Sequence, residues 1–172
     1  MITPTAGRPQ QPLTEPEVIQ NPALGAYAIW QFALGHQTDD GRPPTFPLAF
    51  LVLPLVLHRR TLDVIGSTRK TSGLALFAAK LGEEHENLVA VHERALLLRA
   101  LTLQSIAMGA SARLLTVDYV GATIRANALE PKVKKPILPE RTKDIAPAAE
   151  KLGYWFSKVS LLQVATALRV EF

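Results

Sequence analysis

The stretch FPLAFLVLPLVLHRR, residues 46–60, decides how this chain folds, because such an apolar run belongs either in a membrane or in a protein core. A helix that spans a bilayer needs about 20 consecutive apolar residues, and the apolar part, Phe46 to Leu57, is much shorter. Pro47 and Pro54 each remove a backbone N–H, and lipid offers no replacement partner. We therefore predict a run buried in the core of a soluble protein, as two short pieces separated at Pro54.

Composition supports a single globular domain. The chain has 172 residues, which is long enough for one hydrophobic core. Apolar residues make up 48% and charged residues 20%, as is usual for globular proteins. The formal net charge of +4 permits contact with nucleic acid but does not require it. No cysteine is present, which excludes disulfides and thiolate metal sites and fits a reducing cytoplasm.

The chain begins with a proline-rich segment and then turns helical. Residues 1–20 contain four prolines and little apolar surface, so we expect a flexible arm. The segment NPALGAYAIWQFALGHQ, residues 21–37, follows. Asn21 is a good N-cap and Pro22 occupies the first helical position, where a missing N–H costs nothing. The segment predicts a helix of about four turns.

The middle of the chain changes from helical to strand-like periodicity. Residues 87–110 predict the longest helical stretch, with a break near Ala100–Thr102. Alternating β-branched residues then predict a β-hairpin from about Leu114 to Ala126, with a tight turn at Val120–Gly121. Helices followed by a hairpin are the outline of a winged helix. We expect a mainly α (α+β) fold, with a winged-helix-like core over residues 21–130 and the hairpin as its wing.

The last part of the chain combines a linker with two more helices. Residues 131–143 read as a basic, proline-rich linker. Residues 144–172 predict a helical hairpin that packs on the core. Within it, Ser160 and Gln163 have the spacing of a capping box at the start of the last helix.

Motifs for chemistry are missing from the sequence. Neither GxxxxGK[ST] nor GxGxxG occurs, which argues against an ATPase or a dinucleotide enzyme. His85 and His92 are seven residues apart, which is longer than the spacing that chelating pairs use. Asp39–Asp40 and Glu83–Glu84 are adjacent in sequence, so their side chains diverge. We expect no catalytic residue, no metal and no cofactor.

Two groups of residues are candidates for contacts with other molecules. Three aromatic residues follow one another near the C-terminus; Tyr154 should reach the rim of its helix, and we assign Tyr154 and Trp155 as a possible partner interface. A solvated basic surface is the simpler reading of the cationic residues, which are otherwise candidates for contacts with DNA phosphates. These residues are Arg59, Arg60, Arg69, Lys70, Lys132, Lys134 and Lys135.

Four segments occur in a recognisable order: NPALGAYAIWQFALGHQ (21–37), PLAFLVLPLVLHRRT (47–61), STRKTSGLALF (67–77) and AEKLGYWFSKVS (149–160). In order and spacing they resemble the middle component of bacterial three-component ABC ATPase systems. The resemblance covers about residues 20–172. Its most specific pieces are the Asn-Pro start, the Pro/Leu run that ends in a histidine, and the motif KLGYWF. None of these is a catalytic motif, so the resemblance rests on packing and interface patterns.

The resemblance implies a role in an assembly. A large ABC ATPase related to the SMC and Rad50 proteins, the middle component and an effector protein would be encoded together and act against phage or plasmid DNA, as in Lamassu-type defence. The middle component would be a non-catalytic adaptor between the ATPase and the effector, with no membrane contact. The proline-rich arm and the cationic linker depart from the family pattern, which leaves open which surface meets which partner.

Two other functions compete with the adaptor. A free-standing winged-helix regulator should aim Arg, Asn or Gln side chains at base edges. The stretch before the predicted wing, residues 101–114, offers only Gln104 and Arg113, which favours the adaptor. An enzyme would need titratable groups clustered around a substrate, and the sequence shows no such pattern.

Overall fold

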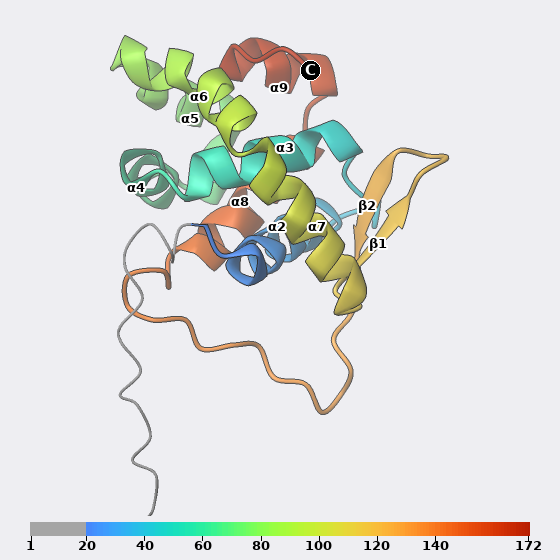
Figure 1. The fold of residues 1–172 in the computed structure, drawn as a ribbon. Helices are drawn as coiled ribbons and strands as arrows, with labels where there is room; N and C mark the ends of the chain where they lie inside the picture. The colour runs from blue at the N-terminus through green and yellow to red at the C-terminus, as the bar shows by residue number, and fades with distance from the viewer. Residues whose placement is uncertain (1–19) are drawn as a thin grey trace, which may run out of the picture.

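The computed structural model describes residues 20–172, with the side chain of His85 excepted, so the arm predicted for residues 1–20 lies almost wholly outside the described residues (Figure 1). Helices dominate the described part, and one two-stranded antiparallel sheet accompanies them. The elements are α2 (Pro22–His36), α3 (Phe46–Val56), α4 (Arg59–Ser67), the 3-10 turn η1 (Lys70–Ser72), α5 (Gly73–Gly82), α6 (His85–Leu97), α7 (Arg99–Ser111), β1 (Leu115–Asp118), β2 (Thr123–Ala126), α8 (Ile145–Ser157) and α9 (Leu161–Leu168).

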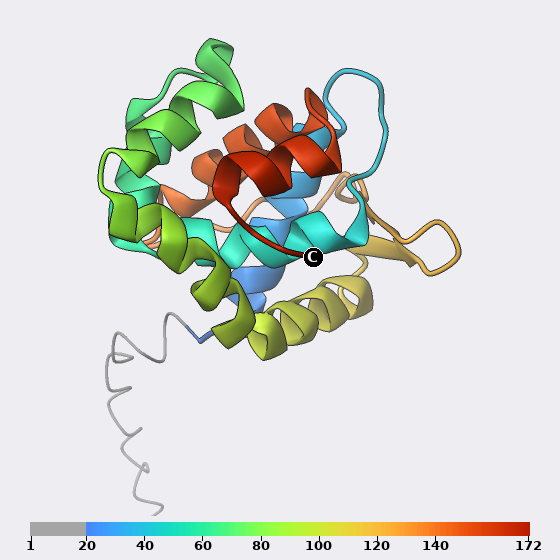
Figure 2. The same cartoon turned by 90° about the horizontal axis from the view of Figure 1, so that it is seen from above.

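Helix α2 is the central element of the fold. The side chain of Asn21 caps it and accepts the backbone N–H of Ala23 at 2.9 Å, which confirms the predicted start. Every residue from Gly25 to Ala33 is buried, so the helix has no solvent-facing side over this length. Figures 1 and 2 show α2 in the middle of the bundle, flanked by α7 and α8.

Helices α2 and α8 pack backbone against backbone. A Cβ atom on Gly153 of α8 would lie 1.9 Å from the carbonyl oxygen of Phe32, and one on Gly35 of α2 would lie 2.0 Å from the carbonyl oxygen of Glu150. Real Cβ atoms do not come so close to backbone oxygens, and a backbone cannot move aside as a side chain can. Glycine is therefore required on both helices at this crossing.

The apolar run is buried, as predicted, but it forms one helix. Helix α3 continues through Pro54 to Val56, so the prediction of two separate pieces is wrong. Pro54 lies near the C-terminal end of α3, where only two helical residues follow it. Its carbonyl oxygen accepts a hydrogen bond from Nε of Arg94 at 3.2 Å. Pro47 lies in the first turn, where its missing N–H costs nothing. Among residues 20–172, no helix has the length and apolar character needed to cross a bilayer.

The long helical stretch is divided earlier than predicted. Helix α6 ends at Leu97 and α7 begins at Arg99, because Leu98 has φ −93° and ψ 7°. The break expected near Ala100–Thr102 is therefore misplaced. Helix α6 contacts α3 and α5, whereas α7 packs along α2, and these separate attachments turn the chain at Leu98.

The β-hairpin is confirmed, with a wider turn than predicted. Leu115 pairs with Ala126 and Asp118 pairs with Thr123, so four residues, 119–122, connect the strands. Ala122 has φ 48°, and the N–H of Phe46 donates to its carbonyl oxygen at 2.7 Å, which ties the hairpin to the start of α3. The helices and the hairpin match the expected mainly α fold, and the winged-helix assignment stays a prediction.

The C-terminal helices belong to the same core. One cluster of buried apolar side chains extends from Tyr27 to Val170 and includes residues of both α8 and α9. The predicted capping box is present, since Ser160 Oγ accepts the N–H of Gln163 at 3.2 Å and Gln163 Oε1 accepts the N–H of Ser160 at 2.8 Å. Residues 127–144 connect β2 to α8 without a helix or strand.

The α2–α8 crossing predicts an unequal response to two similar substitutions. We expect Gly153→Ala to lower the free energy of unfolding by about 3 kcal/mol, since the added methyl group meets a backbone carbonyl. Gly66→Ala in α4 is the matched control, because its Cβ would enter open space, and we expect a gain of about 1 kcal/mol from helix propensity. Urea denaturation followed by circular dichroism measures both, and equal stability of the two variants would contradict the packing described.

Candidate partner-binding surfaces

The two cations at the start of α4 already have acidic partners. Nε of Arg59 lies 3.2 Å from Oδ1 of Asp63, one turn further along the helix. Arg60 forms an ion pair with Glu84. Both arginines are exposed, and each is matched by a carboxylate, so they are poorer candidates for phosphate contact than the sequence suggested.

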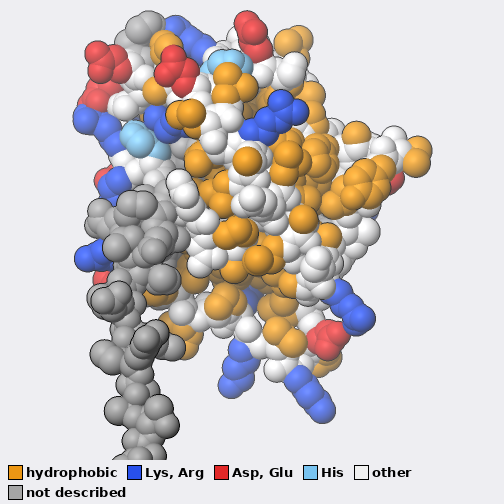
Figure 3. All heavy atoms as spheres, viewed as in Figure 1, with side chains coloured by type: hydrophobic (Ala, Val, Ile, Leu, Met, Phe, Trp, Pro, Cys, Tyr) orange, Lys and Arg blue, Asp and Glu red, His pale blue; other side chains and the backbone are white. Residues whose placement is uncertain are grey.

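The linker lysines remain exposed. Lys132 and Lys134 are solvent-accessible, and among residues 20–172 neither of them forms an ion pair. Nζ of Lys135 lies 5.5 Å from the ring centroid of Trp30, a cation–π distance. Figure 3 shows Lys and Arg side chains projecting below the body of the molecule, where the linker runs in Figure 1. The linker is therefore the best cationic surface among the predicted candidates.

The KLGYWF motif is mainly a packing motif. Trp155 is 1% exposed, its ring stacks on Phe77 at a centroid distance of 5.4 Å, and its Nε1 donates to the carbonyl oxygen of Lys70 at 2.8 Å. A partner cannot reach this side chain in the structure, so we withdraw Trp155 from the predicted interface. Tyr154 is half-buried, and its ring has Lys70 at 4.5 Å and Lys158 at 4.8 Å. The assignment of Tyr154 as a partner contact stays a prediction.

The lysine that begins this motif caps a helix. Nζ of Lys151 donates to the carbonyl oxygens of Ile65 and Thr68, each at 2.9 Å, and to that of Gly66 at 3.3 Å. Carbonyl groups at the end of a helix lack partners within the helix, and a cation satisfies them well. Burial lowers the pKa of Lys151. This lysine fixes the end of α4 onto α8.

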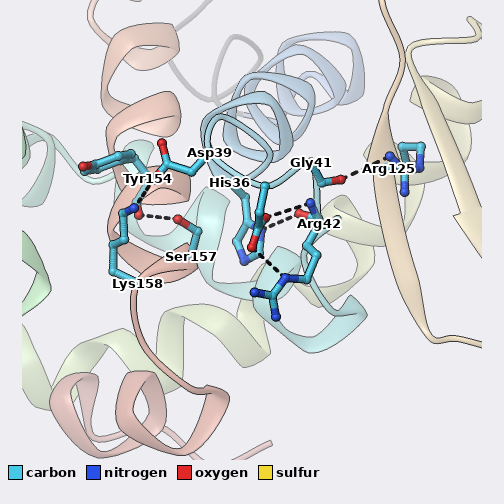
Figure 4. Close-up of polar contacts among 9 residues, drawn as sticks. His36, Asp39, Gly41, Arg42, Arg125, Tyr154, Ser157 and Lys158 are labelled. Carbon is cyan, nitrogen blue, oxygen red and sulfur yellow. Dashed lines mark hydrogen bonds and ion pairs between the residues drawn. The ribbon is translucent and has the colours of Figure 1, made fainter.

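Polar side chains near the ends of α2 and α8 hold the loop after α2 (Figure 4). Nδ1 of His36 donates to the carbonyl oxygen of Arg42 at 2.9 Å, and the side chains of Asp40 and Arg42 form an ion pair at 2.6 Å. Lys158 of α8 pairs with Asp39 in the same loop. Each of these groups thus has a structural partner, and the loop is anchored at several points.

This polar cluster does not have the arrangement of a catalytic site. The Ser157 hydroxyl donates to the carbonyl oxygen of Tyr154 at 2.8 Å rather than to a base (Figure 4). His36 directs Nδ1 to a backbone oxygen. Within residues 20–172, no group of three His, Cys, Asp or Glu side chains is placed to hold a metal ion.

A second histidine joins three helices. Nδ1 of His58 accepts the backbone N–H of Thr61 at 3.4 Å and lies 2.8 Å from the Thr61 hydroxyl, so His58 is the N-cap of α4. Arg94 of α6 donates to the same hydroxyl at 3.4 Å. Burial lowers the pKa of His58, and the charges of Arg94 and Arg60 lower it further. A neutral imidazole is required here, because only an unprotonated Nδ1 can accept.

Exposed apolar side chains gather around the junction of α6 and α7. Leu96 is 59% exposed and Leu97 is 81% exposed. Leu96 also lines a groove of about 290 Å³ between α3, the α6–α7 junction and the last residues of the chain, which we call the apolar groove. Its walls include Phe46, Phe50, Ala95, Leu96, Arg99 and Phe172. Apolar surface of this kind marks interaction sites more often than chance exposure does.

The hairpin tip is a second exposed apolar feature. Tyr119 is 88% exposed and Val120 is 99% exposed. Oδ1 of Asp118 accepts the N–H groups of Val120 at 2.9 Å and Gly121 at 3.0 Å, which fixes the turn. Figure 3 shows apolar side chains over α7 and along the projecting hairpin. The tip therefore presents two apolar side chains on a rigid support.

Sequence reasoning missed both apolar features, although signals were present. Three consecutive leucines, residues 96–98, cannot all face the core from one helix. Tyr119 and Val120 stand in the connection between two strands, where polar residues and glycine are usual.

The family model described as ABC-three component (ABC-3C) system Middle Component 3 matches residues 10–172. The chain belongs to this family. Neither a curated protein nor a solved structure matches it. The match covers nearly the whole chain and confirms the resemblance drawn from the sequence motifs.

The two histidines predict that acid destabilises this middle component. Burial lowers the pKa of His36, and burial and two arginines lower that of His58, both from 6.5. The unfolded chain therefore binds protons at a higher pH than the folded chain does. The contribution of the two neutral histidines to the free energy of unfolding is fully present above pH 6.5 and is lost as the pH falls through the lowered pKa values. Urea denaturation between about pH 7 and about pH 5 measures this loss.

His58→Asn separates the capping role from the titration. Asparagine is a good N-cap and does not titrate, so the variant should keep most of its stability at neutral pH and lose less than the wild type in acid. An unchanged stability of the wild type over this pH range would show that the histidine environments are not as described.

Proposed function

We propose that this middle component is a non-catalytic adaptor, which links an ABC ATPase related to the SMC and Rad50 proteins to an effector protein in a bacterial defence complex. The observation that carries the proposal is apolar surface left uncovered on a domain whose core is already complete. The apolar groove lies over the buried cluster, two of whose members, Leu51 and Val170, line it, whereas Leu96 in the groove and Tyr119 and Val120 at the hairpin tip stay exposed. Such surface favours association with other proteins.

The molecule offers two chemically different surfaces. The apolar groove and the hairpin tip meet at Phe46, which lines the groove and whose N–H bonds to the hairpin turn. The linker instead presents exposed lysines, Lys132 and Lys134 among them. An adaptor needs at least two contact surfaces, and surfaces of different chemistry can select different partners. This division supports the linking role.

Contact with DNA, in this proposal, is limited to phosphates. Lysines on an extended linker can neutralise phosphate charge without reading bases. The hairpin tip is unsuited to this task, because residues 118–123 contain Asp118 and no Lys or Arg. The runner-up, a free-standing winged-helix regulator, would need cations at its wing and base-reading side chains on the preceding helix. The chemistry of the tip favours the adaptor.

Co-expression with the two proteins encoded beside this chain tests the proposal. We expect the ATPase, this chain and the effector to elute together from a size-exclusion column. The control omits this chain, and the ATPase and the effector should then elute separately, because the link between them is missing. Failure of this chain to co-elute with either protein, together with sequence-specific duplex binding by the chain alone, would support the regulator instead.

A further inference from the structure

Two segments that are far apart in the sequence meet at one turn of the structure. The segment STRKTSG, residues 67–73, runs from the end of α4 to the start of α5, and the motif KLGYWF, residues 151–156, lies on α8. Lys151 and Trp155 of the motif both donate to backbone carbonyl oxygens of the α4–α5 region, and Trp155 Nε1 reaches that of Lys70 at 2.8 Å. The motif therefore holds the turn between α4 and α5 in a fixed position.

The outward side of this turn carries cations and hydroxyl groups. Arg69, Lys70, Thr71 and Ser72 are all exposed. Within residues 20–172, neither Arg69 nor Lys70 forms an ion pair, and the hydroxyls of Thr71 and Ser72 accept and donate no hydrogen bond. Four consecutive side chains thus present donors that the described fold does not use.

Tyr154 of α8 brings a further cation to the turn. Its ring centroid lies 4.5 Å from Nζ of Lys70 and 4.8 Å from Nζ of Lys158, so one ring holds two ammonium groups. Lys158 also pairs with Asp39, which neutralises part of its charge (Figure 4). Lysines that are already held in place lose less side-chain entropy when they bind a ligand. We call this set the basic platform: Arg69, Lys70, Thr71, Ser72, Tyr154 and Lys158.

We propose that the basic platform binds duplex DNA through its phosphates, without reading the base sequence. Arg, Lys, Ser, Thr and Tyr are side chains that donate to phosphate oxygens in protein–DNA complexes, and every member of the platform is one of these. The inference rests on the phosphate contact in the proposed function and gives that contact a second site, apart from the linker lysines.

The charges of the platform suit a polyanion better than a single acidic side chain. Its three cations face one carboxylate, that of Asp39, which pairs with Lys158 only. A duplex carries a negative charge about every 1.7 Å along its axis and can meet several cations at once. Base reading is not expected, because the 3-10 turn Lys70–Ser72 is too short to fill a major groove.

Binding of a labelled duplex of random sequence tests the platform. Fluorescence anisotropy follows the titration of the duplex with the full chain over a range of salt concentrations. The platform variant Arg69→Gln/Lys70→Gln removes two unpaired cations. The matched control Arg59→Gln/Arg60→Gln removes the same charge from the neighbouring α4, where each arginine already has a carboxylate partner. Circular dichroism melts establish that every variant folds.

We expect the platform variant to bind the duplex about tenfold more weakly than the wild type at about 50 mM salt. The slope of log affinity against log salt should fall in magnitude by about 2, since each lost phosphate contact removes about one. The control should leave both values close to those of the wild type. Tyr154→Leu keeps every charge but releases the two lysines, so it should weaken binding about threefold with an unchanged slope.

Equal affinities and slopes in the platform variant and the control would overturn the platform, and the linker contact and the adaptor role would stand. If the wild type binds no duplex, both DNA contacts fail, whereas co-elution with the ATPase and the effector still decides the adaptor role. The two failures are therefore distinguishable.

An acidic protein surface is the competing occupant of the platform. Poly-glutamate, added at the same concentration of charge as unlabelled duplex, should displace the labelled duplex poorly, because it lacks the regular spacing of phosphates. Displacement as complete as that by unlabelled duplex would show that carboxylates fit equally well and would overturn the assignment to DNA.

Discussion

The close approach of α2 and α8 is the constraint on which the rest of the structure depends. Gly35 and Gly153 let the two backbones meet where any Cβ would collide with a carbonyl oxygen. Because α8 lies so near, Phe156 reaches Phe32 at a ring-centroid distance of 5.6 Å, edge to face. Lys151, two residues before Gly153, is placed to cap α4. One backbone contact thus aligns the core and the end of a neighbouring helix.

Several polar side chains of this core hold the ends of helices. Lys151, Arg94 and His58 each satisfy a backbone group at a helix end, where a packed helical domain has carbonyl or N–H groups without partners. Groups in such roles hold the helices in place. The apolar groove, the hairpin tip and the linker lysines lie on the surface of this core, where such features suit recognition.

Local signals in the sequence predicted local structure well. Asn21 before Pro22, and Ser160 three residues before Gln163, mark helix starts because the capping interactions lie within one turn. Alternation around Val120 located the hairpin for the same reason. The errors concern tertiary contacts. Pro54 remains in a helix that Arg94 of α6 supports, and Leu98 turns the chain although leucine is a good helix former.

The candidate site was less predictable than the fold. The sequence placed Trp155 at an interface because it could not show that Phe77 of α5 lies opposite. It made Arg59 and Arg60 candidates for phosphate contact without showing their acidic partners, one of which, Glu84, is distant in sequence. The apolar groove depends on α3, the α6–α7 junction and the chain end together, and no local pattern reports such a convergence.

Hydrogen exchange of the chain, alone and mixed with the ATPase and effector proposed as its partners, tests most directly whether a rigid α2–α8 core supports separate docking surfaces. Amides of α2 and α8 should exchange slowest in both states, through global unfolding only, since their packing defines the fold. Amides of the α6–α7 junction or the hairpin should gain protection in the complex. Early exchange in α2 or α8, or new protection confined to other elements, would contradict this account.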